Sequence, residues 1–121
     1  IDMKKARPEI FKGQDNKVEQ LIDAVMKYLN TGEGAYPRED IERGISGTSV
    51  TNFELSTDAI IHPKYGAMYF DASVSDYDGY AGDFYEASVE YMDEMPPGSD
   101  GSEMKDFSNF QQLLNWVKSL A

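Results

Sequence analysis

The chain has 121 residues and no cysteine, and its 22 Asp and Glu against 11 Lys and Arg give a formal charge of -11. This length suits one domain with a single hydrophobic core. The lack of cysteine excludes disulfides, thiol catalysis and thiolate metal sites, and the negative charge disfavours direct binding of nucleic acid or anionic lipid. No apolar run approaches the roughly 20 residues that a membrane-spanning helix needs, and the N-terminus lacks the apolar core of a signal peptide. We therefore expect a cytoplasmic protein without membrane contact.

The excess negative charge lies almost entirely in the second half of the chain. Residues 1–66 hold nine Lys and Arg against eleven Asp and Glu, whereas residues 67–121 hold two against eleven. Such a field attracts basic protein surfaces over a Debye length of about 10 Å. A simpler interpretation is that the acidity only confers solubility.

The first predicted elements are a tail and a helix. Residues 1–14 mix charged residues with Pro8 and Gly13 and are predicted to form an N-terminal tail. From Asn16 to Asn30, apolar residues recur at helical spacing, and Asp15 or Asn16 can cap the helix. The apolar positions are Val18, Leu21, Ile22, Val25, Met26 and Leu29. One face of this helix is thus expected to pack on the core.

The middle of the chain is predicted to change from a polar connection to strands. Residues 31–47 are polar, with a short helical segment expected over 36–43 between Pro37 and Gly44. Residues 49–61 are expected to be extended, with a break at 56–58 that divides them into two short strands.

Residues 68–92 are predicted to form the central β-hairpin of a sheet. Apolar residues alternate on both sides of Asp78-Gly79, a pair that favours a two-residue turn. The apolar set is Met68, Phe70, Ala72, Val74, Tyr85, Ala87, Val89 and Tyr91. A two-residue turn at Asp78-Gly79 would place Phe70 opposite Ala87 and Asp71 opposite Glu86, with the apolar set on one face and an acidic set on the other.

The C-terminal part is predicted to be a loop followed by a helix. Residues 93–106 are rich in Pro, Gly, Ser and acidic residues and are expected to form a mobile acidic loop. Ser108 and Gln111 have the spacing of a capping box, and an apolar stripe follows them. The complete prediction is a single α+β domain over 1–121. In it, an antiparallel three- to four-strand sheet, a meander with a central hairpin, packs in two layers against an N-terminal and a C-terminal helix.

No residue pattern supports catalysis or metal binding. Asp76, Asp78, Asp83 and Glu86 are oxygen ligands of the kind that calcium prefers, but they do not match the spacing of a calcium-binding loop. His62 is the only histidine and has no cysteine to complete a zinc site. We therefore expect a protein that is not an enzyme and holds no cofactor or metal.

The acidic face of the hairpin is the candidate functional surface. Aromatic side chains among its carboxylates would supply contact energy, while the charges steer a basic partner into place. The candidate partner-binding residues are Tyr69, Asp71, Asp76, Asp78, Asp83, Phe84, Glu86, Glu90, Asp93 and Glu94.

The function that this surface predicts is inhibition of another protein. Carboxylates can take the place of phosphates against the Lys and Arg of a nuclease or another nucleic-acid-binding enzyme. An immunity protein against a nuclease toxin and a phage anti-defence or anti-CRISPR protein would both work in this way. The alternative is a structural or housekeeping domain without enzymatic activity, whose acidity only confers solubility.

Overall fold

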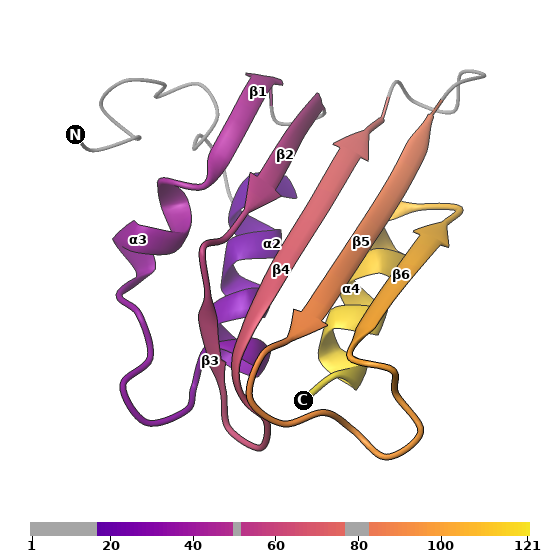
Figure 1. The fold of residues 1–121 in the computed structure, drawn as a ribbon. Coiled ribbons are helices and arrows are strands. Elements are labelled where there is room, and N and C mark those ends of the chain that lie inside the picture. Colours follow the sequence, from indigo (N-terminus) through magenta and orange to yellow (C-terminus); the bar gives the residue numbers. More distant parts are fainter. Residues whose placement is uncertain (1–16, 50–51, 77–82) are drawn as a thin grey trace.

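A computed structural model describes residues 17–49, 52–76 and 83–121 of the chain, as an α+β arrangement of helices and one antiparallel sheet (Figure 1). The helical segments are α2 (Lys17–Ala24), the π-helical η2 (Val25–Leu29), α3 (Arg38–Glu42) and α4 (Phe110–Ser119). The strands are β1 (Ile45–Ser49), β2 (Asn52–Ser56), β3 (Ile60–His62), β4 (Gly66–Ser75), β5 (Phe84–Tyr91) and β6 (Ser102–Phe107). The predicted α+β fold class is confirmed.

The sheet has six strands, so the expected count of three to four is wrong. Its order is β1-β2-β4-β5-β6, and β3 also pairs with β4. Because β2 and β3 pair with successive parts of β4, neighbours in the sheet follow the order of the chain, as in a meander. Figure 1 shows α2 and α4 on one face of the sheet, with α3 at its β1 edge. This third helix makes the arrangement less simple than the predicted two layers.

The predicted break between β2 and β3 is confirmed, and Thr57 bridges it. The backbone N–H of Thr57 donates to the carbonyl of Phe70 at 3.1 Å, and its hydroxyl accepts from the N–H of Phe70 at 3.0 Å. The side chain thus satisfies backbone groups of β4 at the point where strand pairing stops. The chain can therefore bend between the two strands without leaving these groups unpaired.

The hairpin of β4 and β5 has the predicted faces but not the predicted register. Phe70 lies opposite Val89 and Asp71 opposite Ser88, two positions away from the expected partners. The predicted opposition of Asp71 and Glu86 is therefore wrong. A shift of two residues keeps every side chain on its face, so the alternating pattern cannot distinguish the two registers. The predicted turn at Asp78-Gly79 lies outside the described residues.

Strands β1 and β6 were not expected from the sequence. β1 contains one large apolar residue, Ile45, and β6 is an edge strand that is polar except for Met104 and Phe107 and is exposed along most of its length. The strand β6 begins within the segment predicted as a loop over 93–106, so that loop ends at Gly101. Neither strand carries the alternating apolar pattern from which strands are predicted.

Both predicted core helices form, with a different cap on the second. The side chain of Asn109, not Ser108, accepts from the backbone N–H of Gln112 at 2.9 Å and caps α4. The caps proposed for the first helix lie outside the described residues. The helices bury Val18, Leu21, Ile22, Val25, Leu29, Phe110, Leu113 and Val117 against the apolar face of the sheet.

Candidate protein-binding surface

The face of the sheet opposite α2 and α4 is covered by no described helix, and we call it the open face. The strand register and the alternation of side chains place five carboxylates on it: Glu54, Asp71, Glu86, Glu90 and Asp106. The one lysine in β6, Lys105, lies opposite the core residue Ala87 and so belongs to the helix side. Among the described strand residues, the open face therefore carries no Lys or Arg.

Three of these carboxylates form a row across the sheet. Glu54 lies opposite Ser73, Ser73 opposite Glu86, and Glu86 opposite Asp106. Neighbouring strands are about 4.8 Å apart, so Glu86 and Asp106 lie at that spacing and Glu54 at about twice that distance from Glu86. The row concentrates negative charge along a line perpendicular to the strands.

Asp71 extends the negative charge into the next row. It lies opposite Ser88, which places it diagonal to both Glu86 and Glu90. The hydroxyl of Ser56 on β2 donates a hydrogen bond to the Asp71 carboxylate and so orients it. A shallow groove of about 230 Å³ follows this row, lined by Asp71, Ser88, Val89, Glu90, Ser102, Glu103 and Met104.

Large apolar side chains interrupt the acidic surface. Phe84 is 49% exposed and Met104 68% exposed, and both belong to the open face by their strand positions. Tyr69 on β4 lies opposite Glu90 and is half-buried. Exposed apolar groups among charges are typical of surfaces that bind another protein, because contact with the partner removes their apolar area from water and so favours binding.

The structure brings together five of the ten predicted site residues and places four of the other five elsewhere. Tyr69, Asp71, Phe84, Glu86 and Glu90 share the open face. Asp76 forms an ion pair with Lys17 of α2 at 3.4 Å, on the helix side. The carboxylate of Asp93 accepts from the N–H of Ala67 at 3.0 Å. Glu94 is exposed after β5, Asp83 directly precedes β5, and Asp78 lies outside the described residues.

The sequence reasoning missed three residues of the open face. Glu54 stands between the core residues Phe53 and Leu55, so the alternation in β2 was the signal that could have identified it. Asp106 and Met104 belong to β6, whose polar sequence does not predict a strand. These two side chains join the surface only through the pairing of β6 with β5.

His62 has a structural position rather than a catalytic one. It is buried at the end of β3, stacks on Tyr65, and its Nδ1 accepts from the backbone N–H groups of Lys64 and Tyr65 at 3.0 and 3.3 Å. Its Nε2–H therefore donates to the carbonyl of Leu120 at 2.6 Å and ties the end of α4 to the sheet. Burial lowers the pKa of His62, more than the hydrogen bond to Leu120 raises it, so the neutral ring is favoured.

Arg38 joins α2 to α3 through three carboxylates. Its guanidinium donates to Glu19 and Asp23 at 2.5 Å each and to Glu42 at 3.1 Å. Burial of the guanidinium lowers the pKa of Arg38, but the hydrogen bonds and charges of Asp23, Glu19 and Glu42 outweigh it, and the net pKa is raised. This cluster of one guanidinium and three carboxylates holds the two helices together.

Neither a metal centre nor a membrane segment is found within the described ranges. No group of three or more His, Asp or Glu side chains in residues 17–49, 52–76 and 83–121 is arranged to hold a metal ion. In the same part of the chain, no helix is sufficiently long and apolar to span a membrane.

Comparison of the chain with protein-family models, with curated proteins and with solved structures found no match. The functional interpretation therefore rests on the chemistry of the open face.

Proposed function

We propose that this protein is cytoplasmic and acts as a small acidic inhibitor that covers the basic, nucleic-acid-binding site of another protein. A toxin-immunity protein and a phage anti-defence protein of the anti-CRISPR type are the two settings that fit. The observation that carries this proposal is the open face, where Glu54, Asp71, Glu86, Glu90 and Asp106 occur without a Lys or Arg among the described strand residues.

The physics of the surface supports a polycationic partner. A site that binds nucleic acid holds several Lys and Arg side chains that together neutralise phosphates. Carboxylates that lie one or two strand spacings of about 5 Å from each other on a sheet offer these side chains several negative charges at once. The same charges accelerate association, because long-range attraction steers the encounter.

The apolar side chains on this face supply the contact energy that charges alone do not. Exposed ion pairs contribute little net affinity, and the centre of a protein interface is generally formed by aromatic and Met side chains. Met104 lies opposite Ser88, in the row that contains Asp71, and Phe84 lies two residues before Glu86 on β5. Both side chains are exposed. We infer that they form the desolvated contacts and that the carboxylates surround them.

The opposition of Glu86 and Asp106 also supports a functional role for the charge. Like charges directly opposite on neighbouring strands are destabilising by a few tenths of a kcal/mol to about 1 kcal/mol. A surface selected for stability alone would favour a Lys or Thr at one of these positions. Binding to a basic partner would relieve this repulsion.

The test is a charge-reversal variant, Glu54→Lys, Glu86→Lys and Glu90→Lys together, compared with the wild type in a pull-down from host lysate. The matched control reverses the exposed Glu33, Glu39 and Glu94, which lie outside the open face and give the same change in net charge. We expect the first variant to lose the captured partner and the control to keep it. We also expect the wild-type affinity to fall steeply as salt is added.

Two results would contradict the proposal. One is equal binding of the partner by the wild type and the open-face variant. The other is a partner without a basic site, bound equally well at low and high salt. Either result would favour the alternative that the acidity only confers solubility.

A further inference from the structure

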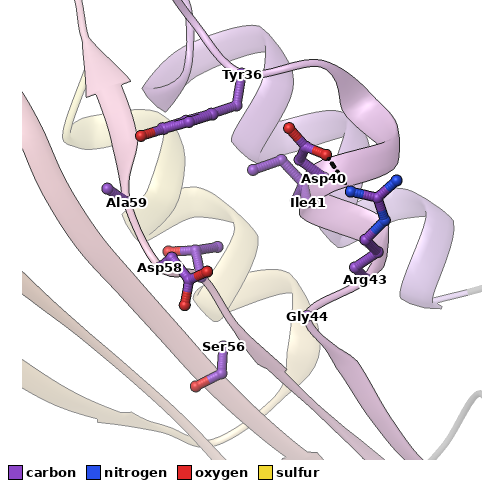
Figure 2. Close-up of a pocket in the computed structure, with 9 residues that line it drawn as sticks. Tyr36, Asp40, Ile41, Arg43, Gly44, Ser56, Asp58 and Ala59 are labelled. Carbon is purple, nitrogen blue, oxygen red and sulfur yellow. Dashed lines mark hydrogen bonds and ion pairs between the residues drawn. The ribbon is translucent and has the colours of Figure 1, made fainter.

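A cavity of about 500 Å³ lies where α3 meets the connection between β2 and β3 (Figure 2). Its lining residues are Tyr36, Asp40, Ile41, Arg43, Gly44, Ser56, Thr57, Asp58 and Ala59. In Figure 2 the ring of Tyr36 and the side chain of Asp58 enter from two different sides. The cavity was not expected from the sequence, because its walls come from two separate segments of the chain, 36–44 and 56–59.

Gly44 allows the two walls to approach each other. The N–H of Ser56 donates to the carbonyl of Gly44 at 3.0 Å, and a Cβ built on Gly44 would lie 2.1 Å from the carbonyl oxygen of Ser56. Any side chain at this position would push the end of α3 away from β2. The glycine therefore keeps the cavity narrow at one end.

The charges in the cavity favour a cation. Arg43 and Asp40 neutralise each other in an ion pair of 2.7 Å. Asp58 is exposed and, within the described part of the chain, its side chain takes part in no hydrogen bond or ion pair. The cavity thus has one carboxylate available for a ligand, and Tyr36, which is 39% exposed, offers an aromatic ring in addition.

The cavity adjoins the open face through Ser56. This residue lines the cavity, and its hydroxyl also donates to the carboxylate of Asp71 on the open face. A basic protein bound over the acidic rows would therefore lie next to the mouth of the cavity. A long cationic side chain at that edge could enter.

We propose that this cavity accepts an arginine side chain of the partner, with the guanidinium against the Tyr36 ring and donating to the Asp58 carboxylate. The inference rests on the proposed function for the source of the arginine. Arginine fits better than lysine because its planar guanidinium can stack on an aromatic ring and bind a carboxylate through two N–H groups at once. An anion would meet the Asp58 carboxylate, and Arg43 is already paired.

The ligand chemistry can be tested without the partner. The probe is N-acetyl-arginine N-methylamide, titrated into the ¹⁵N-labelled protein, and the control is the citrulline counterpart, which has the same shape but no charge. We expect the arginine probe to shift the amide signals of Tyr36, Arg43, Asp58 and Ala59 with a Kd of roughly millimolar order. We expect the citrulline probe to bind at least about fivefold more weakly.

Single substitutions test whether the arginine probe binds in the cavity. Asp58→Asn should weaken binding of the arginine probe about two- to fivefold, and Asp58→Lys should weaken it further. Glu94→Gln, an exposed position after β5 and outside both the cavity and the open face, should leave it unchanged. The inference is overturned if citrulline binds equally well, if inorganic phosphate shifts the same signals in place of arginine, or if the shifts occur on the open face only.

Measurements with the captured partner separate this inference from the proposed function. Weaker partner binding by Asp58→Asn and by Tyr36→Leu supports the arginine cavity. Full partner affinity in Asp58→Asn, together with loss of binding in the open-face variant, overturns the cavity and leaves the proposed function intact. Loss of binding in Asp58→Asn, together with full affinity in the open-face variant, supports the arginine cavity and overturns the proposed role of the open face.

Discussion

Glu86 and Asp106 lie directly opposite each other on β5 and β6, with both side chains on the face of the sheet that no described helix covers. Opposed residues on neighbouring strands have Cβ atoms about 5 Å apart, so the two carboxylates repel each other in the free protein. This relationship links the stability of the sheet to its proposed role as a surface for a basic partner.

Replacing Asp106 with Lys should stabilise the protein and weaken partner binding. The change turns a repulsive pair into an attractive one, which we expect to raise the free energy of unfolding by about 0.3 to 1 kcal/mol at low salt. Urea unfolding at low and high salt measures this, and the gain should shrink as salt screens the pair. Glu94→Lys, with the same charge change on an exposed residue after β5, is the control. An equal gain in both variants would show that net charge alone matters.

Acidification should destabilise the protein through His62. Burial lowers the pKa of the folded-state ring below its ordinary value of about 6.5, so the unfolded chain binds the proton more readily. The contribution of His62 is fully present above about pH 6.5 and is lost as the pH falls from there through the lower folded-state pKa. Because the sequence has one histidine, its NMR ring signal can be titrated without ambiguity. A measured pKa at or above 6.5 would contradict this account.

Removing the positive charge of Arg38 should destabilise the contact between α2 and α3. Arg38→Gln leaves Glu19, Asp23 and Glu42 close together without a cation, and the Glu42 side chain is only 9% exposed. We expect a loss of about 1 to 3 kcal/mol, less than for a fully buried pair because Arg38 is itself partly exposed. Arg43→Gln, which breaks an exposed pair with Asp40, should cost under about 1 kcal/mol. Chemical denaturation of the two variants side by side gives the comparison.

Truncating the apolar pair at the centre of the hairpin should cost far more than truncating the open face. Phe70 and Val89 lie opposite each other and are 0% and 3% exposed, so Phe70→Ala and Val89→Ala should each cost about 2 to 4 kcal/mol. Tyr69→Ala, next in sequence but on the open face, should cost less. Losses below about 1 kcal/mol at both core positions would mean that the faces of the hairpin are reversed.

Local patterns in the sequence determined the elements with a buried apolar face. Helical spacing from Val18 to Leu29 and alternation from Met68 to Tyr91 identify which side of each element faces the core, because burial of apolar side chains imposes that period. The break after Ser56 could be predicted in the same way. The acidic composition of the second half likewise predicts an acidic surface on the sheet.

Only the tertiary structure decided the register, the edge strands and the cavity. The period of two is the same before and after a shift of two residues, so the sequence could not distinguish Ser88 from Glu86 as the neighbour of Asp71. An edge strand such as β6 buries few side chains and needs no alternating pattern, yet its pairing with β5 brings Asp106 against Glu86. The wall contributed by α3 meets Ser56 and Asp58 because Gly44 has no side chain, a contact between segments that no local pattern encodes.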